Sequence, residues 1–363
     1  MKIDKIILHW VQIPLLEPFR ISNGSVAVKD SIVVEVQAEA CGGFGEASPM
    51  AGSFYSAETP ESTWQALAER LAPAVMEGGF QAALVNGPPG EPFAKAGLDG
   101  ALWDHACWRT ATPLWQMLGS ALRPIPSGVA IGIFDTIDEL LDRVARYRAQ
   151  GYQRVKIKIQ PGWDLEPVRA VRERFGGIPL MADANAAYAA KDIPLFEELD
   201  RFGLMMYEQP LAKDALEEMA ELQRRVRTPV CADESAEPEN LERIITLGAA
   251  RIINIKIQRV GGLGPAIAMH DKARAAGLGC WLGTMPELGI ASAQGLHLAT
   301  FPGFVYPTDV EASARWYCDD LVEPSIDIDE RGFLHIPPGP GSGFAVSREK
   351  LERYTIKNME FTA

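Results

Sequence analysis

One pattern repeats between residues 154 and 258: a short apolar run that carries charged residues near its end, followed by an amphipathic stretch. The runs are RVKIKIQ (154–160), IPLMADA (178–184), LMMYEQP (204–210), TPVCADES (228–235) and RIINIKIQ (251–258). Their length and composition are typical of buried strands, and the stretches between them have the period of surface helices. Strands that alternate with helices through short loops predict a parallel sheet covered by helices.

The pattern extends in both directions from this stretch. Three further runs are SGVAIGI (127–133), LGCWLGT (278–284) and FVYPTDV (304–310). They bring the expected strands to eight, which close naturally into a barrel. Residues 1–60 are predicted to be strands and turns and residues 61–122 helices. We therefore expect an α+β unit over residues 1–122, a barrel over 123–320, and a tail over 321–363 that packs back on the first unit.

Composition limits the class of partner. The 363 residues carry a net charge of −13, and the five cysteines include no CxxC pair. Nucleic acids and anionic membranes both need a basic surface, so neither is an expected partner. Widely spaced thiols, no signal-peptide pattern and no apolar run near the roughly 18 residues of a membrane helix indicate a soluble cytoplasmic protein. We also expect a homo-oligomer that acts on a small carboxylate molecule.

Five charged residues stand at equivalent places on successive runs. They are Lys158, Asp183, Glu208, Asp233 and Lys256, separated by 25, 25, 25 and 23 positions. This spacing is one strand–helix unit, so all five should lie at the C-terminal ends of strands, where barrel enzymes carry their chemistry. A single carboxylate there is usually a helix cap or a salt-bridge partner. Five charges in phase are costly to bury unless they serve each other or a metal.

The three carboxylates, Asp183, Glu208 and Asp233, predict a metal site on adjacent strands. Oxygen donors alone suit a hard cation, so Mg²⁺ is the first expectation and Mn²⁺ the second. Nothing in the histidine and cysteine pattern suggests zinc.

The two lysines predict acid–base chemistry. Strands two and six lie four apart in an eight-stranded barrel, so Lys158 and Lys256 should face each other across it. An amine on each face of a substrate suits proton abstraction from one face and delivery to the other. Lys156 points the same way as Lys158, because side chains alternate along a strand. A neighbouring ammonium and a metal should lower the pKa of Lys158 toward the range of a general base, and the metal should stabilise an enediolate.

Two other classes of function compete with this hypothesis. One is an aldolase barrel that forms a Schiff base on Lys158 or Lys256, and the carboxylate trio argues against it. The other is a catalytically silent binding protein of the same fold, and the intact set of five charged residues argues against that.

The strand ends also carry motifs that resemble a known family. VKIKIQ, MADANAAY, YEQP, CADES and INIKIQRVGG resemble the muconate-cycloisomerase subgroup of the enolase superfamily. IQPGWDLEPVRAVRERFG, GIFDTIDELL and DVEASARWYCDDLVEP are similar to its o-succinylbenzoate synthase and N-succinylamino acid racemase branch. The likeness covers nearly the whole chain and implies a modified TIM-like (β/α)7β barrel with an α+β capping domain. It also implies that Lys158 and Lys256 are the acid–base pair and that the three carboxylates bind Mg²⁺.

The resemblance further implies which residues contact the substrate. Capping loops at residues 18–25 and 49–55 should close over it. The expected contacts are Phe19, Ser22, Phe54, Tyr55, Asn185, Gly283, Thr284 and Met285. Thr284 stands where the branch usually has a second glycine, and Ala130 where relatives often carry serine, so the succinyl pocket should be reshaped. The implied reactions are dehydration, as in o-succinylbenzoate synthesis, and racemisation of an N-acylamino acid. A muconate-type cycloisomerase or a dipeptide epimerase is the alternative.

Overall fold

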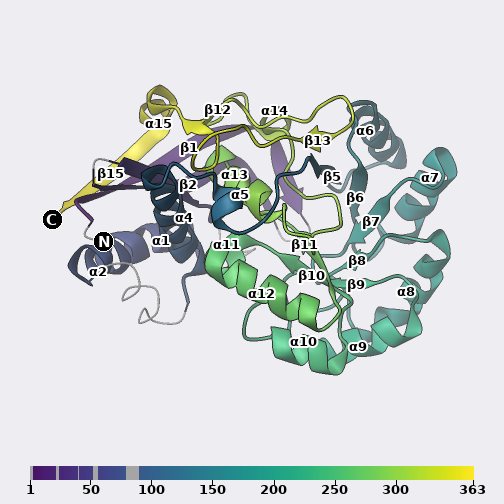
Figure 1. Cartoon of the computed structure of the whole chain (residues 1–363). Coiled ribbons are helices and arrows are strands. Elements are labelled where there is room, and N and C mark those ends of the chain that lie inside the picture. The colour runs from purple at the N-terminus through teal and green to yellow at the C-terminus, as the bar shows by residue number, and fades with distance from the viewer. Residues whose placement is uncertain (1–2, 22–23, 40, 52–55, 79–89) are drawn as a thin grey trace.

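A computed structural model describes residues 3–21, 24–39, 41–51, 56–78 and 90–363, without the side chains of residues 19–21, 24 and 25. Its two parts are an antiparallel sheet with helices packed on it and a parallel sheet curled into a barrel (Figure 1). This architecture confirms the expected fold class.

The antiparallel sheet joins the two ends of the chain. Its order is β15-β1-β2-β3, with β1 at Lys5–Ile21, β2 at Gly24–Ala38, β3 at Cys41–Ala47 and β15 at Thr355–Thr362. The last strand pairs with the first from Lys5↔Thr362 to Val11↔Thr355. We call this sheet and the helices on it the cap. Its helical segments are α1 (Pro60–Ala66), the π-helical turn η1 (Leu67–Leu71), α2 (Ala72–Gly78), α4 (Pro92–Arg109) and α5 (Leu114–Met117). The domain boundaries near residues 122 and 320 stay a prediction.

The parallel sheet forms the barrel wall. Its order is β11-β10-β9-β8-β7-β6-β5. The strands are β5 (Gly128–Ile131), β6 (Arg154–Lys158), β7 (Leu180–Asp183), β8 (Tyr207–Glu208), β9 (Val230–Ala232), β10 (Ile252–Ile255) and β11 (Gly279–Leu282). The helical segments between and after them are α6 (Ile137–Ala149), α7 (Leu165–Phe175), η2 (Ala190–Asp192), α8 (Ile193–Leu199), η3 (Asp200–Phe202), α9 (Leu216–Arg225), α10 (Leu241–Leu247), α11 (Ile257–Val260), α12 (Leu263–Ala275) and α13 (Gly289–Leu298).

The expected eighth strand, residues 304–310, differs from the prediction. It lies between β11 and β5 but makes only isolated bridges, Cys280↔Phe304 and Ser127↔Thr308. Thr308 donates its N–H to Pro126 and accepts that of Gly128, at 2.9 and 2.8 Å. Pro307 has no N–H to give a ladder, which breaks the regular pairing. A few backbone hydrogen bonds therefore close the barrel where a full strand was expected.

The remaining elements belong mainly to the tail. They are β4 (Ile125–Pro126), α14 (Ser313–Trp316), β12 (Val322–Glu323), β13 (Phe333–Leu334), β14 (Ala345–Val346) and α15 (Arg348–Tyr354). Two small pairs, β12–β14 and β4–β13, hold this tail together and attach it to the start of the barrel.

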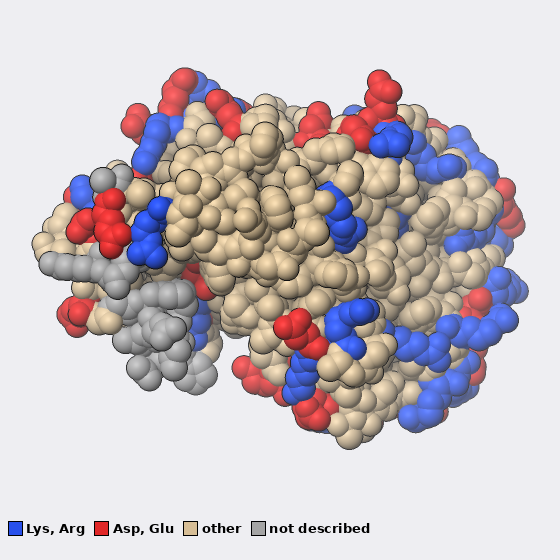
Figure 2. Space-filling view, in the orientation of Figure 1, with Lys and Arg blue, Asp and Glu red and all other residues tan. Residues whose placement is uncertain are grey.

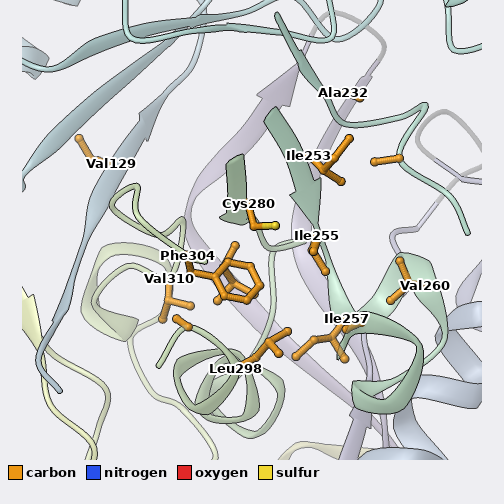
Figure 3. Close-up of a cluster of buried hydrophobic side chains, with 14 of the residues drawn as sticks. Val129, Ala232, Ile253, Ile255, Ile257, Val260, Cys280, Leu298, Phe304 and Val310 are labelled. Atoms are coloured by element: carbon orange, nitrogen blue, oxygen red, sulfur yellow. The ribbon is translucent and has the colours of Figure 1, made fainter. Parts of the chain in front are cut away.

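Residues on β10 show how the barrel separates its inside from its outside. Ile253 and Ile255 belong to the large hydrophobic core that includes residues of the surrounding helices (Figure 3). Ile252 belongs instead to a small buried cluster with Cys231 and Trp281. Because side chains alternate along a strand, Asn254 and Lys256 follow Ile252 on the inner side. The inner wall is therefore apolar at its floor and polar at its mouth.

The surface carries charges of both signs. On the face shown in Figure 2, lysine and arginine side chains are interspersed with aspartate and glutamate around the margin of the molecule. Within the described part of the chain, no helix has the length and apolarity needed to cross a membrane.

The contact between β3 and α4 predicts a strict need for glycine. A Cβ added at Gly45 would lie 2.0 Å from the carbonyl oxygen of Gly97, whereas one at Gly42 would meet nothing closer than 3.7 Å. Backbone atoms cannot move aside as a flexible side chain can. We expect Gly45→Ala to lower the free energy of unfolding by about 1–3 kcal/mol or more. Urea denaturation of Gly45→Ala and Gly42→Ala measures the difference, and equal losses in the two variants would contradict this account of the packing.

Candidate active site

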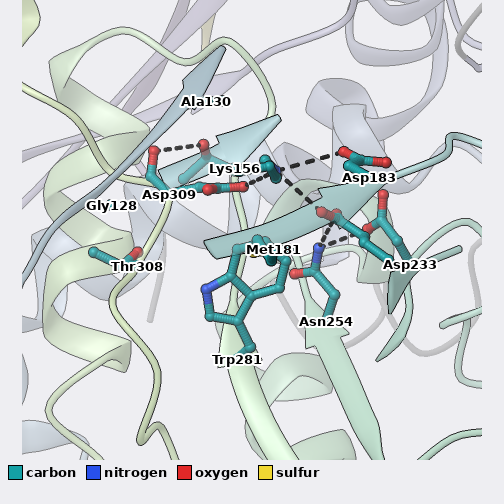
Figure 4. A network of polar contacts seen from close by, with 12 residues as sticks. Gly128, Ala130, Lys156, Met181, Asp183, Asp233, Asn254, Trp281, Thr308 and Asp309 are labelled. Carbon is teal, nitrogen blue, oxygen red and sulfur yellow. Dashed lines mark hydrogen bonds and ion pairs between the residues drawn. The ribbon is translucent and has the colours of Figure 1, made fainter. Parts of the chain in front are cut away.

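The charged residues predicted at the strand ends all stand at the C-terminal ends of barrel strands, and Figure 4 shows Asp183 and Asp233 of this set with Lys156 and Asn254. Lys156 and Lys158 lie on β6, Asp183 and Glu208 end β7 and β8, and Asp233 and Lys256 directly follow β9 and β10. None of these six residues is more than 7% exposed. The regular sequence spacing therefore corresponds to one buried polar layer at the mouth of the barrel.

Lys158 and Lys256, which we call the outer lysines, reach the same cavity from different strands. In the sheet order, β6 and β10 stand four strands apart. Lys158 and Lys256 nonetheless both line one small cavity of about 50 Å³, together with Asp183. Lys156 lines it as well, as expected from its position two residues before Lys158. A small molecule held there would have an amine on either side.

Each outer lysine is bound to a carboxylate of a neighbouring strand. Lys158 Nζ lies 2.5 Å from Asp183 Oδ2 and donates to Asn185 Oδ1 at 2.7 Å. Lys256 Nζ lies 2.8 Å from Asp233 Oδ2, and Arg259 binds the other oxygen of Asp233 at 2.6 Å. Burial alone would raise the pKa of both carboxyl groups, but these cations outweigh burial and lower it. Both aspartates are therefore held as carboxylates.

Lys156 belongs to a second ionic group deeper in the barrel. Its ammonium lies 2.5 Å from Asp309 Oδ2 and 3.2 Å from Glu208 Oε2. Arg154 binds the other oxygen of Asp309. Lys156 Nζ and Arg154 Cζ both lie over the ring of Trp281, at 4.9 and 5.1 Å from its centre respectively. Burial would lower the pKa of Lys156, but Asp309, Glu208 and Asp183 raise it well above its usual range. Lys156 thus stays positively charged.

Sequence reasoning missed Asp309, Arg154 and Asn254. Asn254 donates through Nδ2 to Glu208 Oε1 at 3.0 Å and to Asp233 Oδ1 at 2.8 Å. A signal was present in each case. Asn254 and Arg154 stand two residues before inward-facing lysines, and Asp309 is the next-to-last residue of its apolar run, as Asp183 is of its own. A period of two, applied to every strand, would have found them.

The predicted substrate contacts divide into three groups. Thr284 and Met285 line the cavity, as do Ala130, Glu311 and Trp316. Asn185 instead joins Lys158 to Glu234, and Gly283 packs on Asn254, where an added Cβ would lie 2.2 Å from Oδ1. The other predicted contacts lie outside the described side chains: Phe19, Ser22, Phe54 and Tyr55.

The donor set fits a hard divalent cation in kind. Three carboxylates stand at the ends of adjacent strands, and the buried Glu208 Oε2 accepts no hydrogen bond, although the Lys156 ammonium lies 3.2 Å from it. Among the described residues, however, no three carboxylate, histidine or cysteine side chains form a ready-made metal cluster. Lys158, Lys256 and Asn254 contact oxygens that a metal would use. A metal bound at these oxygens would either share them with these groups or displace them, since a carboxylate oxygen has more than one lone pair.

The fold and this site define a class of barrel enzyme, one with a cap and with lysines facing each other across a carboxylate trio. The chain belongs to the enolase superfamily. Residues 3–119 match the family model of the mandelate racemase/muconate lactonizing enzyme N-terminal domain, and residues 139–350 match the enolase C-terminal domain-like model. Members of this superfamily generally use a divalent metal.

Individual relatives support the membership over the full length. The chain is 40% identical to an o-succinylbenzoate synthase of Geobacillus kaustophilus, covering 98% of this chain and 96% of the relative. It is 41% identical to an N-succinylamino acid racemase of Amycolatopsis sp, covering 98% of each. A crystal structure of an enolase superfamily member from Listeria innocua superimposes with a TM-score of 0.95 at 33% identity, covering 100% of this chain and 99% of that one. The resemblance inferred from the motifs is confirmed.

The buried ionic group around Asp309 predicts a large effect on stability. Asp309→Asn removes the charge that faces Arg154 and Lys156, so we expect a loss of about 3–5 kcal/mol in the free energy of unfolding at neutral pH. Burial would raise the pKa of Asp309, but Lys156 and Arg154 outweigh burial and lower it. A lowered pKa contributes stability above the usual aspartate range, and that stability is lost as the pH falls. The difference between the variant and the parent should therefore shrink below about pH 4.

Asp142→Asn provides the control, because Asp142 is a surface partner of Arg174 with 77% of its side chain exposed. Exposed pairs contribute about 0–1 kcal/mol. Urea denaturation at several pH values compares the two variants, and an Asp309→Asn loss no larger than that of Asp142→Asn would count against the assigned role.

Proposed function

We propose that this enzyme removes a proton α to a carboxylate and that Lys158 and Lys256 are its acid–base pair. One observation carries the proposal: lysines from strands four apart line a single cavity together with Asp183, and Glu208 and Asp233 stand at the ends of the next two strands. The pair can take a proton from one face of a bound molecule and return one to the other.

We propose Asp183, Glu208 and Asp233 as the ligands of the metal, with Mg²⁺ first and Mn²⁺ second. Carboxylate oxygens are the donors that both ions accept, and no histidine or cysteine belongs to the trio. When bound, the cation supplies positive charge to the substrate carboxylate as negative charge develops there.

The chain's own side chains divide the proton transfers between them. In racemisation, the neutral amine of one lysine accepts the α-proton as the C–H bond breaks. The protonated lysine on the opposite face then donates its proton to the same carbon. In dehydration, the hydroxyl group leaves as water, and one lysine can act first as base and then as acid. Lys156, held charged by Asp309 and Glu208, contributes positive charge beside Lys158.

The names of the relatives support two reactions for this chain: dehydration to o-succinylbenzoate and racemisation of an N-succinyl or other N-acylamino acid. Cycloisomerisation of a muconate and epimerisation of a dipeptide use the same proton chemistry and remain the alternative. Ala130 and Thr284 line the cavity, so they contribute to the choice of substrate. We propose that Phe19, Ser22, Phe54 and Tyr55 of the capping loops contribute to it as well.

Metal dependence tests the carboxylate assignment. We expect chelator-treated enzyme to be inactive and Mg²⁺ or Mn²⁺ to restore it. Asp183→Asn, Glu208→Gln and Asp233→Asn should each lower activity at least about 100-fold, because each removes a charged oxygen donor. Calorimetric titration with Mg²⁺ reports binding separately from turnover. Full activity of metal-free enzyme, or unchanged Mg²⁺ affinity in all three variants, would refute the assignment.

Deuterium exchange tests the two-lysine mechanism. In D₂O, the parent enzyme should incorporate deuterium at the α-carbon from both enantiomers of a racemisable substrate. Lys158→Ala and Lys256→Ala should both stop racemisation, because each direction needs one donor and one acceptor. Each variant should still exchange one enantiomer through the lysine that remains, and the two preferences should be opposite. NMR of the α-proton follows both reactions, and near-normal racemisation in either variant would exclude the mechanism.

A further inference from the structure

We propose that Glu46 and Gln258 are positioning residues through which the cap orients Lys256 and not Lys158. The inference rests on the proposed function, since it concerns one lysine of the acid–base pair. Glu46 is the next-to-last residue of the cap strand β3. Gln258 stands in α11, two residues after Lys256. We call their contact the cap joint.

Glu46 binds the barrel through both carboxylate oxygens. Oε1 accepts hydrogen bonds from the Leu288 N–H at 2.9 Å and from the hydroxyls of Ser31 and Ser48. Oε2 accepts the Ala291 N–H at 3.0 Å. Leu288 is the N-cap residue of α13 and Ala291 lies in its first turn, where free N–H groups and the helix dipole favour an anion. A cap carboxylate thus fixes the segment that follows Thr284 and Met285 in the cavity wall.

Gln258 binds the same cap strand through its amide. Its Nε2 donates to the carbonyl oxygen of Glu46 at 2.9 Å, and its Oε1 accepts the N–H of Ser48 at 3.0 Å. Only 1% of Gln258 is exposed. This reciprocal pair imitates the contact of one strand with another and leaves little freedom to either side. The backbone after Lys256 is therefore fixed between β10 and the cap.

The two lysines differ in this respect. The backbone after Lys158 is held within the barrel, because the Ile159 N–H donates to the Asp183 carbonyl oxygen at 2.8 Å and Gln160 pairs with Trp163. Lys256 is followed at once by the cap joint. A displacement of about 1 Å at a reacting group can cost about 100-fold in rate. Loosening the cap joint should therefore impair proton transfer on the Lys256 face and leave the Lys158 face nearly unchanged.

The test measures each face alone. Lys158→Ala leaves Lys256 as the exchanging amine, and Lys256→Ala leaves Lys158. Glu46→Gln is added to each background, and α-proton exchange of L- and D-N-succinylphenylalanine in D₂O with Mg²⁺ is followed by NMR. We expect exchange through Lys256 to fall at least about tenfold and exchange through Lys158 to change less than about twofold. Gln258→Met, which keeps volume but removes both amide hydrogen bonds, should give the same split.

Asp104→Asn is the matched control. Asp104 is also a buried cap carboxylate that accepts backbone N–H groups, that of Phe44 at 2.9 Å and that of Ser342, but these partners lie in the cap and the tail. It should affect both faces equally. Thermal unfolding verifies that each variant is folded, and Gln258→Met replaces Glu46→Gln if the latter does not fold. If neither single-lysine variant exchanges, the initial loss of the α-proton from each enantiomer is compared in the parent background.

The outcomes separate the two proposals. A parent enzyme that exchanges no α-proton from either enantiomer and also forms no o-succinylbenzoate refutes the proposed function. Normal exchange in the parent, with equal losses on both faces in Glu46→Gln and Gln258→Met, overturns the positioning role and leaves the proposed function intact.

Discussion

Compensation of buried charge is the constraint on which the barrel depends. An ammonium or carboxylate buried alone would cost several kcal/mol, so every charge on the inner wall needs a partner. The parallel register supplies them, because it sets Lys158 beside Asp183 and Asp183 beside Glu208. A slip of one residue would turn these side chains into the apolar layer under the helices. The alternation that buries Ile253 and Ile255 outside therefore also assembles the site inside.

The ionic layers are stacked along the barrel axis, and each constrains the next. Trp281 and its apolar neighbours fill the floor, Arg154 and Lys156 lie over its ring, and Asp309 binds both cations. Asp309 comes from the segment that closes the barrel with few backbone hydrogen bonds. The two ion pairs of Asp309 thus help to hold this segment against β6, as a longer strand ladder would. The closure of the barrel and the charge of Lys156 depend on the same carboxylate.

Local periodicity explains what could be predicted from the sequence. Lys158, Asp183, Glu208, Asp233 and Lys256 were found because a period of two along each strand and one strand–helix unit between strands fix both face and height. The irregular segment at 304–310 escaped because Pro307 acts against the apolar pattern around it. The cap joint escaped for another reason: Glu46 and Gln258 lie 212 positions apart. No periodic rule predicts which buried glutamine meets which strand, since tertiary packing alone decides that.

Under the proposed function, the same oxygens serve folding and chemistry. Asp183 and Asp233 are partners of Lys158 and Lys256 here, and they are also the proposed ligands of a divalent cation. Two positive groups that compete for one carboxylate repel each other, so a cation at these oxygens disfavours an ammonium beside it. A neutral amine is what a base requires. The ion pairs that stabilise the barrel in this state can therefore give way to a neutral lysine and a metal-bound carboxylate in the reacting enzyme. This requires that the backbone around the lysines stays in place while their partners change. On the Lys256 side, the cap joint is the structure that holds it.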